Sequence, residues 1–345
     1  MSLATKYRPQ KFFDVIEQNV VKAILKNQID SGDIKNCYLF CGPAGVSKTT
    51  VSRIFAKEIN GCDAMITELD AASHSGVDDI RKIVEDSRFK PIGCKYRIYV
   101  IDECHSLSNT AWQSLLKALE EPVPTSIFIF CTTDPQKIPA TIISRIQRFD
   151  FKKISTAGIV DRLKFIINSE NEELGTNYTY DEDALTYIAK LSEGGMRDAI
   201  TSMEKALSFN KDLTIETVAK ALGTVDYTTM FDLTDAVLNF DKKTVIDIIE
   251  TVYDEGNDLK QFIKNYNEFV LDLCKYGIMK SFDYIKIPQT YLSRFKNFNK
   301  DSYDFFPTLL NELINLNNTI KWDSSPKPVI ESTFILLSCE DSGGK

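Results

Sequence analysis

The stretch CYLFCGPAGVSKTT, residues 37–50, joins a short apolar run to a glycine-containing turn that ends in Lys48 and Thr49. It matches the phosphate-binding loop pattern G-x-x-x-x-G-K-[ST], except that Ser47 stands where the pattern has its second glycine. In this pattern a strand leads into the loop and a helix begins near the lysine, so that backbone N–H groups face the phosphates of a nucleotide. Such a unit belongs to a parallel sheet flanked by helices, which constrains the fold of everything around it.

The loop is therefore predicted to bind ATP. The alternative is a glycine turn without a ligand that precedes Lys-Thr by chance. The predicted strand before the turn and the predicted helix after it disfavour this alternative. We expect Lys48 to reach the β- and γ-phosphates and Thr49 to ligate Mg²⁺. A serine held in the left-handed conformation costs roughly 1 to 2 kcal/mol more than glycine, so we expect Ser47 to weaken nucleotide binding by up to roughly tenfold. The predicted loop contacts are Gly42, Pro43, Ala44, Gly45, Val46, Ser47, Lys48, Thr49 and Thr50.

Apolar runs rich in β-branched and aromatic residues alternate with helical patterns in the first 155 residues. The runs are 37–41, 65–70, 97–102, 126–131 and 148–151. From residue 156 helical periodicity replaces the strand signals, with a break at 223–229. We expect three domains: an α/β domain with a parallel five-stranded sheet over 1–155, a small helical domain over 156–222 and an all-helical domain over 223–345.

Charge is unevenly distributed along the chain, whose formal net charge is −8. Residues 1–155 hold 21 Lys and Arg against 18 Asp and Glu, a net charge of +3. The remaining 20 basic and 31 acidic residues give residues 156–345 a net charge of −11. This asymmetry permits a basic nucleic-acid surface on the first part of the chain.

The cysteines give no sign of a metal site or of disulfides. The chain has 8 cysteines without a C-x-x-C pair and only 2 histidines, so reduced thiols are expected and zinc is not. No apolar run approaches the roughly 20 residues that span a bilayer, and residues 1–10 lack the apolar core of a signal peptide. We therefore expect a cytoplasmic protein.

An acidic pair ends the apolar run 97–102. Asp102 and Glu103 follow buried strand residues, where desolvation of two carboxylates is costly without a cation or hydrogen bonds. Asp102 suits the Mg²⁺ shell, and Glu103 suits the activation of an attacking water molecule. A solvent-facing acidic pair is an equally good interpretation of these two residues alone, but the phosphate-binding loop favours the catalytic one.

Six segments of the chain together resemble a known family. They are KYRPQKFFDVIEQ, GPAGVSKTT, ELDAASHSGVDDIRKI, YVIDECHSLSNTAWQSLLKALEEP, CTTDPQKIPATIISR and EGGMRDAI. In this order and spacing they resemble the gamma/tau subunit family of the bacterial DNA polymerase III clamp loader, strongly over residues 4–205 and more weakly through LGTVD and WDSSPKPVIESTFILLSC. More distantly the chain resembles the small subunits of replication factor C. The resemblance implies a P-loop AAA+ domain, a lid that carries sensor 2 and a collar that oligomerises.

The resemblance assigns further roles around the nucleotide, beside the catalytic roles of Lys48 and Glu103. Thr133 matches sensor 1, which reads the γ-phosphate and the attacking water. Arg197 matches the sensor-2 arginine of the lid, and Arg145 matches the arginine that acts in trans on the ATP of the neighbouring subunit. Without the family, each arginine would be read as a surface ion-pair residue. The segment that wraps the adenine is matched by Tyr7, Arg8, Pro9, Val15 and Ile16.

The resemblance also implies contacts with DNA and with a clamp. The family's helix after DAAS follows primer-template DNA by its phosphates, which makes Arg81, Lys82 and His74 candidate DNA contacts. A solvated helix face is the alternative for Lys82 and His74. Phe89 and Ile92 match the wedge that docks into a sliding clamp, although packing under their own loop would give the same pattern.

The chain departs from the family pattern at three places. The space that holds a four-cysteine zinc module in bacterial relatives contains only NGCDAM, with Cys62 alone, so no zinc is expected. Ile146 stands where a cysteine usually follows the serine-arginine pair, a change expected to affect packing only. The sequence also ends after the region that resembles the collar, so the long extension of tau-type subunits is not expected.

The resemblance implies an ATPase subunit of a DNA sliding-clamp loader. ATP binding would hold the clamp open and engage primer-template DNA, and Mg²⁺-dependent hydrolysis at subunit interfaces would release the loaded clamp during DNA replication. The expected partners are other clamp-loader subunits in a pentameric assembly, the sliding clamp and primer-template DNA, with no membrane. One alternative is an ATP-binding but non-hydrolysing structural subunit that donates its arginine. The other is an AAA+ motor on branched DNA, which the collar match disfavours.

Overall fold

The computed structural model describes residues 1–345 except 62, 64, 74–75, 224–226, 283 and 340–345. The chain forms two compact units. Unit 1 comprises Met1–Ile166 and Ser192–Thr201, and unit 2 comprises Ile167–Leu191 and Ser202–Lys345. The three-domain division stays a prediction, because unit 1 takes up Ser192–Thr201 from within the segment expected to form the lid.

Unit 1 contains the predicted parallel five-stranded sheet. Its strands are β1 (Cys37–Cys41), β2 (Ile66–Asp70), β3 (Arg97–Asp102), β4 (Ser126–Thr132) and β5 (Gln147–Asp150). They are hydrogen-bonded in the order β2–β3–β4–β1–β5. The last residues of neighbouring strands lie opposite one another, Cys41 beside Thr132 and Asp70 beside Asp102. The segments that leave the carboxyl ends of these strands therefore meet at one edge of the sheet.

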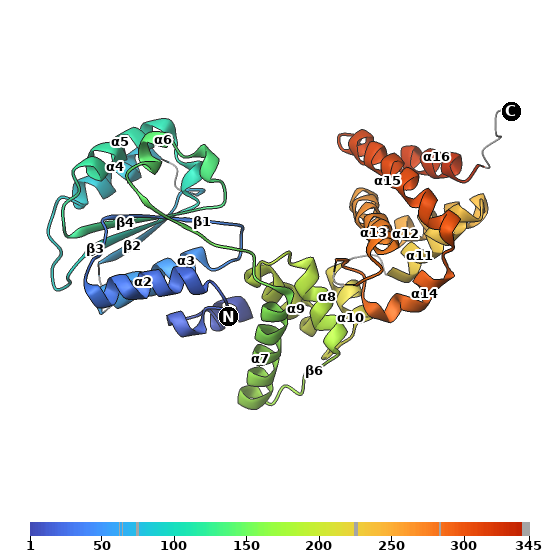
Figure 1. Cartoon of the computed structure of the whole chain (residues 1–345), viewed down its shortest axis with the longest axis horizontal. Coiled ribbons are helices and arrows are strands. Elements are labelled where there is room, and N and C mark those ends of the chain that lie inside the picture. The colour runs from blue at the N-terminus through green and yellow to red at the C-terminus, as the bar shows by residue number, and fades with distance from the viewer. Residues whose placement is uncertain (62, 64, 74–75, 224–226, 283, 340–345) are drawn as a thin grey trace. The chain divides into compact units, whose positions relative to one another are not determined.

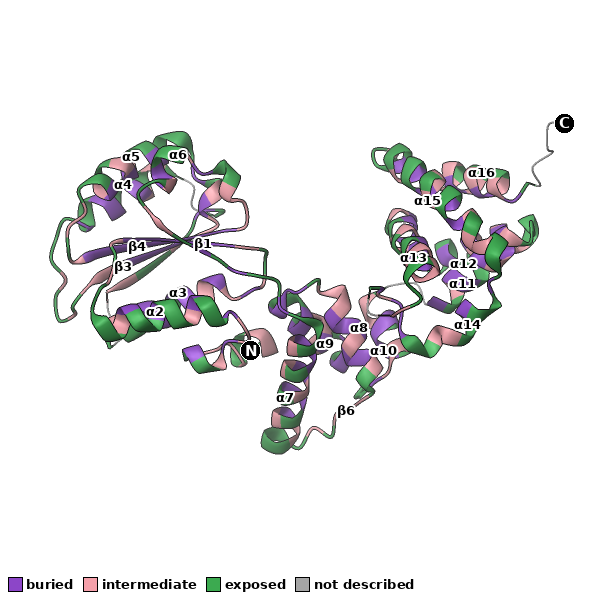
Figure 2. Ribbon diagram, in the orientation of Figure 1, coloured by how far each residue is buried: buried purple, intermediate pink, exposed green. Residues whose placement is uncertain are grey.

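Helices cover both faces of this sheet (Figure 1). One face carries α2 (Asn19–Ser31) and α3 (Lys48–Asn60), and the other carries α4 (Val77–Asp86), α5 (Asn109–Glu120) and α6 (Ala140–Ile143). Tyr38 and Phe40 of β1 belong to the core under α2 and α3, whereas Leu39 belongs to the core under α4 and α5. Figure 2 shows the central strands β1 and β4 buried between these two layers of helices.

Local sequence signals explain where these helices begin and end. The Ser108 hydroxyl accepts a hydrogen bond from the N–H of Ala111 at 3.2 Å and so caps the start of α5. Gly61 ends α3 in the left-handed conformation, with φ 68°, as is common for glycine after a helix. Short elements complete this part of the chain: α1 (Leu3–Lys6), η1 (Phe12–Asp14), η2 (Cys104–Ser106) and η3 (Pro135–Lys137).

The rest of the chain is helical, as its periodicity predicts. α7 (Thr156–Leu174) and α9 (Met196–Phe209) contribute residues to both units. The helices of unit 2 are α8 (Glu182–Leu191), α10 (Ile215–Leu222), α11 (Tyr227–Leu238), α12 (Lys242–Asp254), α13 (Leu259–Met279), α14 (Leu292–Asn297), α15 (Lys300–Ile320) and α16 (Lys327–Leu337), with the short η4 (Gln289–Tyr291). None of the helices in the described residues is long and apolar enough to cross a membrane.

The sequence predicts only helices after residue 156, and the structure adds two short strands to this region. Unit 2 contains a parallel pair of two-residue strands, β6 (Thr179–Tyr180) and β7 (Asp212–Leu213). Strands this short contain only one side-chain alternation, so they leave no period-two pattern in the sequence.

Candidate nucleotide site

The loop between β1 and α3 has the backbone of an anion-binding turn. Gly42, Gly45 and Ser47 all have positive φ angles, of 152°, 72° and 75°. A Cβ on Gly42 would lie 2.5 Å from the carbonyl oxygen of Phe151, and one on Gly45 would lie 2.9 Å from Cα of Gly195. Glycine is therefore required at the first two positions by conformation and by space, whereas the third tolerates a serine in the left-handed region.

Lys48, the first residue of α3, is held inside this loop. Its side chain is 6% exposed, and Nζ donates hydrogen bonds to the carbonyl oxygens of Gly42 at 2.8 Å and Pro43 at 2.7 Å. Burial lowers the pKa of Lys48, and the nearby Glu103 carboxylate opposes that shift. An ammonium group has three donors, so these carbonyls use two of them. The loop thus places a partly desolvated cation where the pattern requires the phosphates of a nucleotide.

The next residue joins α3 to the end of β3. Thr49 Oγ1 donates a hydrogen bond to Asp102 Oδ2 at 2.6 Å, and the N–H of Glu103 donates to Asp102 Oδ1 at 3.0 Å. A hydroxyl and a carboxylate oxygen are ligands that suit Mg²⁺, which usually keeps several waters and takes few ligands from the protein. The described residues contain no group of three or more His, Cys, Asp or Glu side chains that could hold a metal by themselves. The donor pair therefore fits Mg²⁺ bound together with a phosphate.

Glu103 lies in the left-handed region, with φ 46°, and its carboxylate is held by two side chains. Thr133 Oγ1 donates to Glu103 Oε2 at 3.3 Å, and His105 Nδ1 lies 3.2 Å from the same oxygen. His105 Nδ1 also lies 3.1 Å from Thr132 Oγ1. The structure thus brings the predicted catalytic carboxylate and the predicted sensor 1 into contact, through residues that follow β3 and β4.

The sequence interpretation missed His105. The sequence does place this histidine close to the predicted catalytic residues, since it is the second residue after the Asp-Glu pair and one of only 2 histidines in the chain. Nothing in the spacing alone shows that the short helix η2 turns its ring back onto Glu103.

Two arginines that the resemblance assigned to the nucleotide lie close to one another. The N–H of Met196 donates to the carbonyl oxygen of Gly45 at 3.0 Å, so Arg197 at the start of α9 lies beside the loop. Burial, and then the guanidinium groups of Arg53 and Arg197, lower the pKa of Arg8. Neither the Arg8 nor the Arg197 guanidinium forms an ion pair among the described residues, although the Glu68 and Asp102 carboxylates oppose part of the fall in the pKa of Arg8. Like charges that lie close together and are not ion-paired favour a bound anion.

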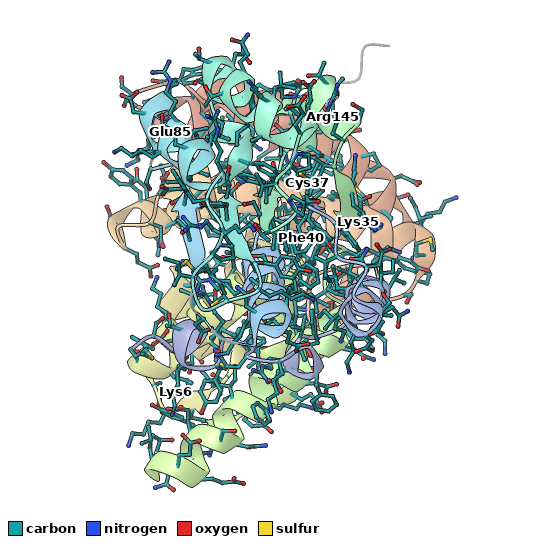
Figure 3. The ribbon with its side chains drawn as sticks, turned by 90° about the vertical axis from the view of Figure 1, so that its left-hand side faces the viewer. Lys6, Lys35, Cys37, Phe40, Glu85 and Arg145 are labelled. Atoms are coloured by element: carbon teal, nitrogen blue, oxygen red, sulfur yellow. The ribbon has the colours of Figure 1, made fainter. Side chains whose placement is uncertain are left out.

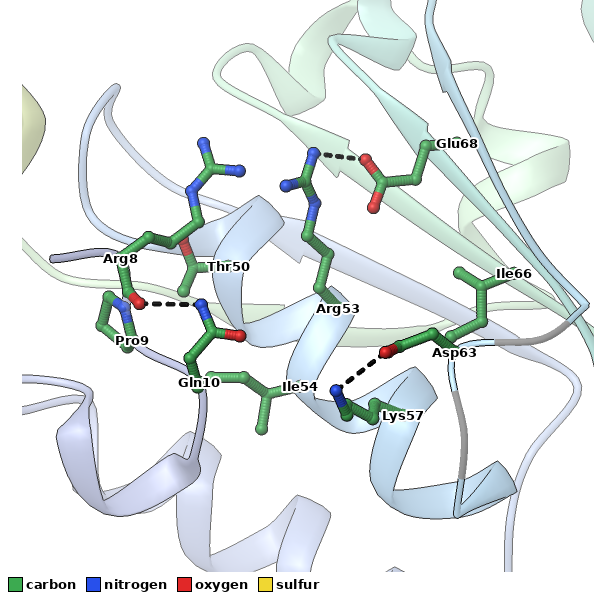
Figure 4. Close-up of a pocket in the computed structure, with 10 residues that line it drawn as sticks. All are labelled: Arg8, Pro9, Gln10, Thr50, Arg53, Ile54, Lys57, Asp63, Ile66 and Glu68. Carbon is green, nitrogen blue, oxygen red and sulfur yellow. Dashed lines mark hydrogen bonds and ion pairs between the residues drawn. The ribbon is translucent and has the colours of Figure 1, made fainter. Parts of the chain in front are cut away.

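Figure 4 shows the pocket of about 370 Å³ that Arg8 lines beside the loop. Thr50 and Arg53 of α3 line it together with Glu68 of β2, and Arg53 is hydrogen-bonded to Glu68. Lys57 at the far end is paired with Asp63 at 2.8 Å. The remaining lining residues are Pro9, Gln10, Ile54 and Ile66. Arg53 and Lys57 are thus ion-paired, whereas Arg8 forms no ion pair among the described residues.

The amino-terminal segment is fixed to the residues that follow β5. The Tyr7 carbonyl oxygen accepts a hydrogen bond from Arg162 Nη2 at 2.9 Å, and Glu17 Oε1 accepts one from the Ser155 N–H at 3.1 Å. Val15 is buried in the core under α2 and α3, whereas Ile16 is half-buried. The structure therefore holds the segment 7–17 against the start of α7, and contact of its residues with an adenine stays a prediction.

Arg145 makes its contacts away from the loop. Its guanidinium is paired with Glu120 at 2.9 Å and donates to the carbonyl oxygen of Thr141 at 2.6 Å. Figure 3 shows it at the outside of the layered unit, whereas Cys37 and Phe40 lie within the sheet. Its position is compatible with action on another subunit, which stays a prediction.

The predicted DNA and clamp contacts are all on the surface of unit 1. Arg81 of α4 is paired with Asp78 at 3.3 Å and Lys82 with Asp79 at 3.8 Å, so acidic neighbours partly balance both cations. His74 lies outside the described residues. The side chains of Phe89 and Ile92 are 65% and 80% exposed, so they do not pack under their own loop. Their exposure leaves them available for a partner.

Comparison with known proteins identifies the family. The family described as DNA polymerase III, delta subunit, matches residues 63–155, and the one described as DNA polymerase III subunits gamma and tau domain III matches residues 213–302. The chain is 33% identical to DNA polymerase III subunit gamma of Buchnera aphidicola subsp. Baizongia pistaciae, over 85% of this chain and 82% of that protein. The chain belongs to the gamma/tau family of DNA polymerase III subunits.

Other gamma/tau relatives are longer than this chain. It is 32% identical to DNA polymerase III subunit tau of Bacillus subtilis over 97% of its own length, but it spans only 62% of that protein. It spans 55% of the gamma/tau subunit of Mycoplasma genitalium, at 33% identity over 90% of this chain. Among solved structures, the Thermotoga maritima RuvB Holliday junction branch migration motor has a TM-score of 0.51, with 20% identity over 67% of this chain and 79% of RuvB. That likeness shows a shared fold.

Proposed function

We propose that this gamma/tau family chain is an ATP-hydrolysing subunit of a DNA sliding-clamp loader. The observation that carries the proposal is the assembly of Thr49, Asp102, Glu103 and Thr133 around a loop that contains the buried Lys48. These residues come from the ends of three different elements. Their contacts suit the roles that phosphoryl transfer requires, namely metal binding, activation of water and contact with the γ-phosphate. Family membership supplies the replication context.

In this proposal, the chain's own residues bind the nucleotide and orient the water. The loop N–H groups and Lys48 would hold the phosphates, with Arg8 and Arg197 as further cations. Mg²⁺, when bound at Thr49 and Asp102, would neutralise negative charge on the phosphoryl oxygens. These cations all stabilise negative charge on the phosphoryl group that is transferred. Removal of any one of them would therefore slow ATP hydrolysis more than it weakens ATP binding.

Glu103 would accept the proton of the attacking water. Thr133 and His105 both contact its Oε2, and no described residue is hydrogen-bonded to Oε1, so Oε1 is the oxygen that can accept. The water oxygen would form the new bond to the γ-phosphorus as the bond to the leaving ADP oxygen breaks. The proton would pass from water to Glu103 and then to the released phosphate or to solvent.

The remaining predicted residues would act on partners. Arg145 would leave Glu120 and reach the ATP of a neighbouring subunit in a pentameric assembly. Arg81, Lys82 and His74 would contact the phosphates of primer-template DNA, and Phe89 with Ile92 would dock into the sliding clamp. In this proposal ATP binding holds the clamp open on DNA, and hydrolysis releases it.

The proposal can be tested by reconstitution with the co-encoded clamp-loader subunits, the clamp and primed DNA. Transfer of clamps onto DNA and release of phosphate would be measured for the wild type and for Lys48→Ala. The proposal predicts that Lys48→Ala abolishes both. Clamp transfer at the wild-type rate without phosphate release from this subunit would instead establish the non-hydrolysing structural subunit.

A further inference from the structure

Unit 2 contains an open groove of about 490 Å³ that α13 and α15 line together. Lys260 and Lys264 lie one helical turn apart on α13, and Asn317, Asn318 and the following Lys321 lie on one face at the end of α15. The groove therefore presents three ammonium groups together with carboxamides from two neighbouring helices.

The cations of this groove have no carboxylate partners among the residues that the structure describes. Lys260 Nζ contacts only the carbonyl oxygen of Lys321, at 3.4 Å, and Lys264 makes no ion pair. Asp258 is the one acidic residue of the groove, and its carboxylate caps α13 by accepting the N–H groups of Lys260 and Gln261. This local positive charge lies within residues 156–345, whose net charge is −11. A cationic cluster in an acidic region is a specific feature and not a general property of the surface.

A large aromatic side chain lies next to the cations. Trp322 directly follows Lys321 and is 86% exposed, and Lys321 Nζ lies 5.2 Å from the centre of its ring. An indole ring that is exposed to water offers a face on which a nucleic-acid base can stack. The carboxamides of Asn317 and Asn318 can donate to and accept from base edges.

We infer that the groove between α13 and α15 binds single-stranded nucleic acid, with phosphates on Lys260, Lys264 and Lys321 and a base on Trp322. Unpaired cations combined with an exposed aromatic face are the features that bind single strands without sequence preference. An acidic peptide would use the lysines alone, so the indole and the carboxamides favour the nucleic acid. This activity is additional to the proposed ATP hydrolysis and uses neither the nucleotide loop nor Arg81.

Tryptophan fluorescence of the full chain tests the inference directly. The chain has 2 tryptophans, and Trp112 is only 2% exposed, so quenching by an added oligothymidylate reports on Trp322. We expect saturable quenching at low salt. A variant with Lys260→Gln, Lys264→Gln and Lys321→Gln should bind at least tenfold more weakly, and the slope of log affinity against log salt should fall in magnitude by about 2 for three lost phosphate contacts.

The matched control removes the same charge from the same unit. Lys242→Gln, Lys243→Gln and Lys300→Gln change three exposed lysines that do not line the groove. This control variant should keep the wild-type affinity, and Trp322→Ala, followed by fluorescence anisotropy of a labelled oligothymidylate, should bind about tenfold more weakly. Equal losses in both lysine variants, or no quenching of the wild type, would overturn the inference. Polyglutamate that quenches Trp322 as strongly as the oligonucleotide would overturn the assignment to nucleic acid.

The test separates this inference from the proposed function. Lys48→Ala should retain the quenching in full, because the groove does not involve the nucleotide loop. Loss of clamp loading with retained quenching would contradict the proposed function and leave nucleic-acid binding by the groove intact. Loss of quenching with normal clamp loading would contradict nucleic-acid binding by the groove and leave the proposed function intact.

Discussion

Replacement of Ser47 by glycine should stabilise unit 1 and tighten ATP binding. Ser47 has φ 75° and ψ 21°, close to the left-handed helical region. That conformation costs roughly 1 to 2 kcal/mol for a residue with a Cβ, whereas glycine loses about 0.5 to 1 kcal/mol of additional chain entropy on folding. The net gain in unfolding free energy for Ser47→Gly is therefore between about 0 and about 1.5 kcal/mol, which corresponds to an increase of up to about 6 °C in Tm.

Two measurements check this estimate, thermal unfolding by circular dichroism and ATP affinity by calorimetry. Removal of the Cβ from the path of the phosphates should lower the Kd for ATP by up to roughly tenfold. Ser47→Ala separates the causes, because it keeps the left-handed Cβ and removes the hydroxyl. Ser114→Gly in the middle of α5 is the matched control and should lower Tm, since glycine is unfavourable inside a helix. A lower Tm and weaker ATP binding for Ser47→Gly would contradict this prediction and show that the hydroxyl stabilises the loop.

Three further predictions concern other residues. His105→Asn should keep turnover within about threefold of wild type because an amide nitrogen can replace Nδ1 near Glu103, whereas His105→Gln and His105→Ala should lower kcat by tenfold or more with little change in the Kd for ATP. Equal kcat values for the asparagine and alanine variants would show that the contact with Glu103 has no effect. Arg81→Ala should weaken binding to primed DNA of any sequence and reduce the salt slope by about 1, and unchanged binding would remove it from the DNA contacts. Burial raises the pKa of Asp272, so the native state binds more protons than the unfolded chain between the raised pKa and 3.8. Stability should therefore fall as pH rises through that window, and Asp272→Asn should remove this dependence in denaturant titrations.

The strands and the loop were predictable from the sequence because their signals are local. The run 37–41, the turn that follows and Lys48 lie within one short segment, and the structure forms β1, the loop and α3 there. The pairing of Thr49 with Asp102 was predictable in outline, since Thr49 follows β1, Asp102 ends β3, and the carboxyl ends of these parallel strands lie at one edge of the sheet. Neither feature required knowledge of distant packing.

The remaining features depend on contacts between distant parts of the chain. Arg8 and Arg197 lie far apart in sequence, and their proximity arises because the start of α9 hydrogen-bonds to Gly45. The contact of His105 with Glu103 depends on the turn direction of a three-residue helix. The lysine groove of unit 2 combines two helices whose individual patterns are only amphipathic. No periodicity in one segment specifies which residues of another segment it will face.

The most direct test of ATP hydrolysis by this chain compares Glu103→Gln with the wild type in single-turnover experiments. Both would be assembled with the co-encoded subunits, clamp and primed DNA, and bound ATP and released phosphate would be measured in the same samples. We expect Glu103→Gln to bind ATP with an unchanged Kd and to release phosphate at least 100-fold more slowly, since the glutamine cannot accept the proton of the attacking water. Phosphate release from the Glu103→Gln subunit at the wild-type rate would show that Glu103 is not the proton acceptor.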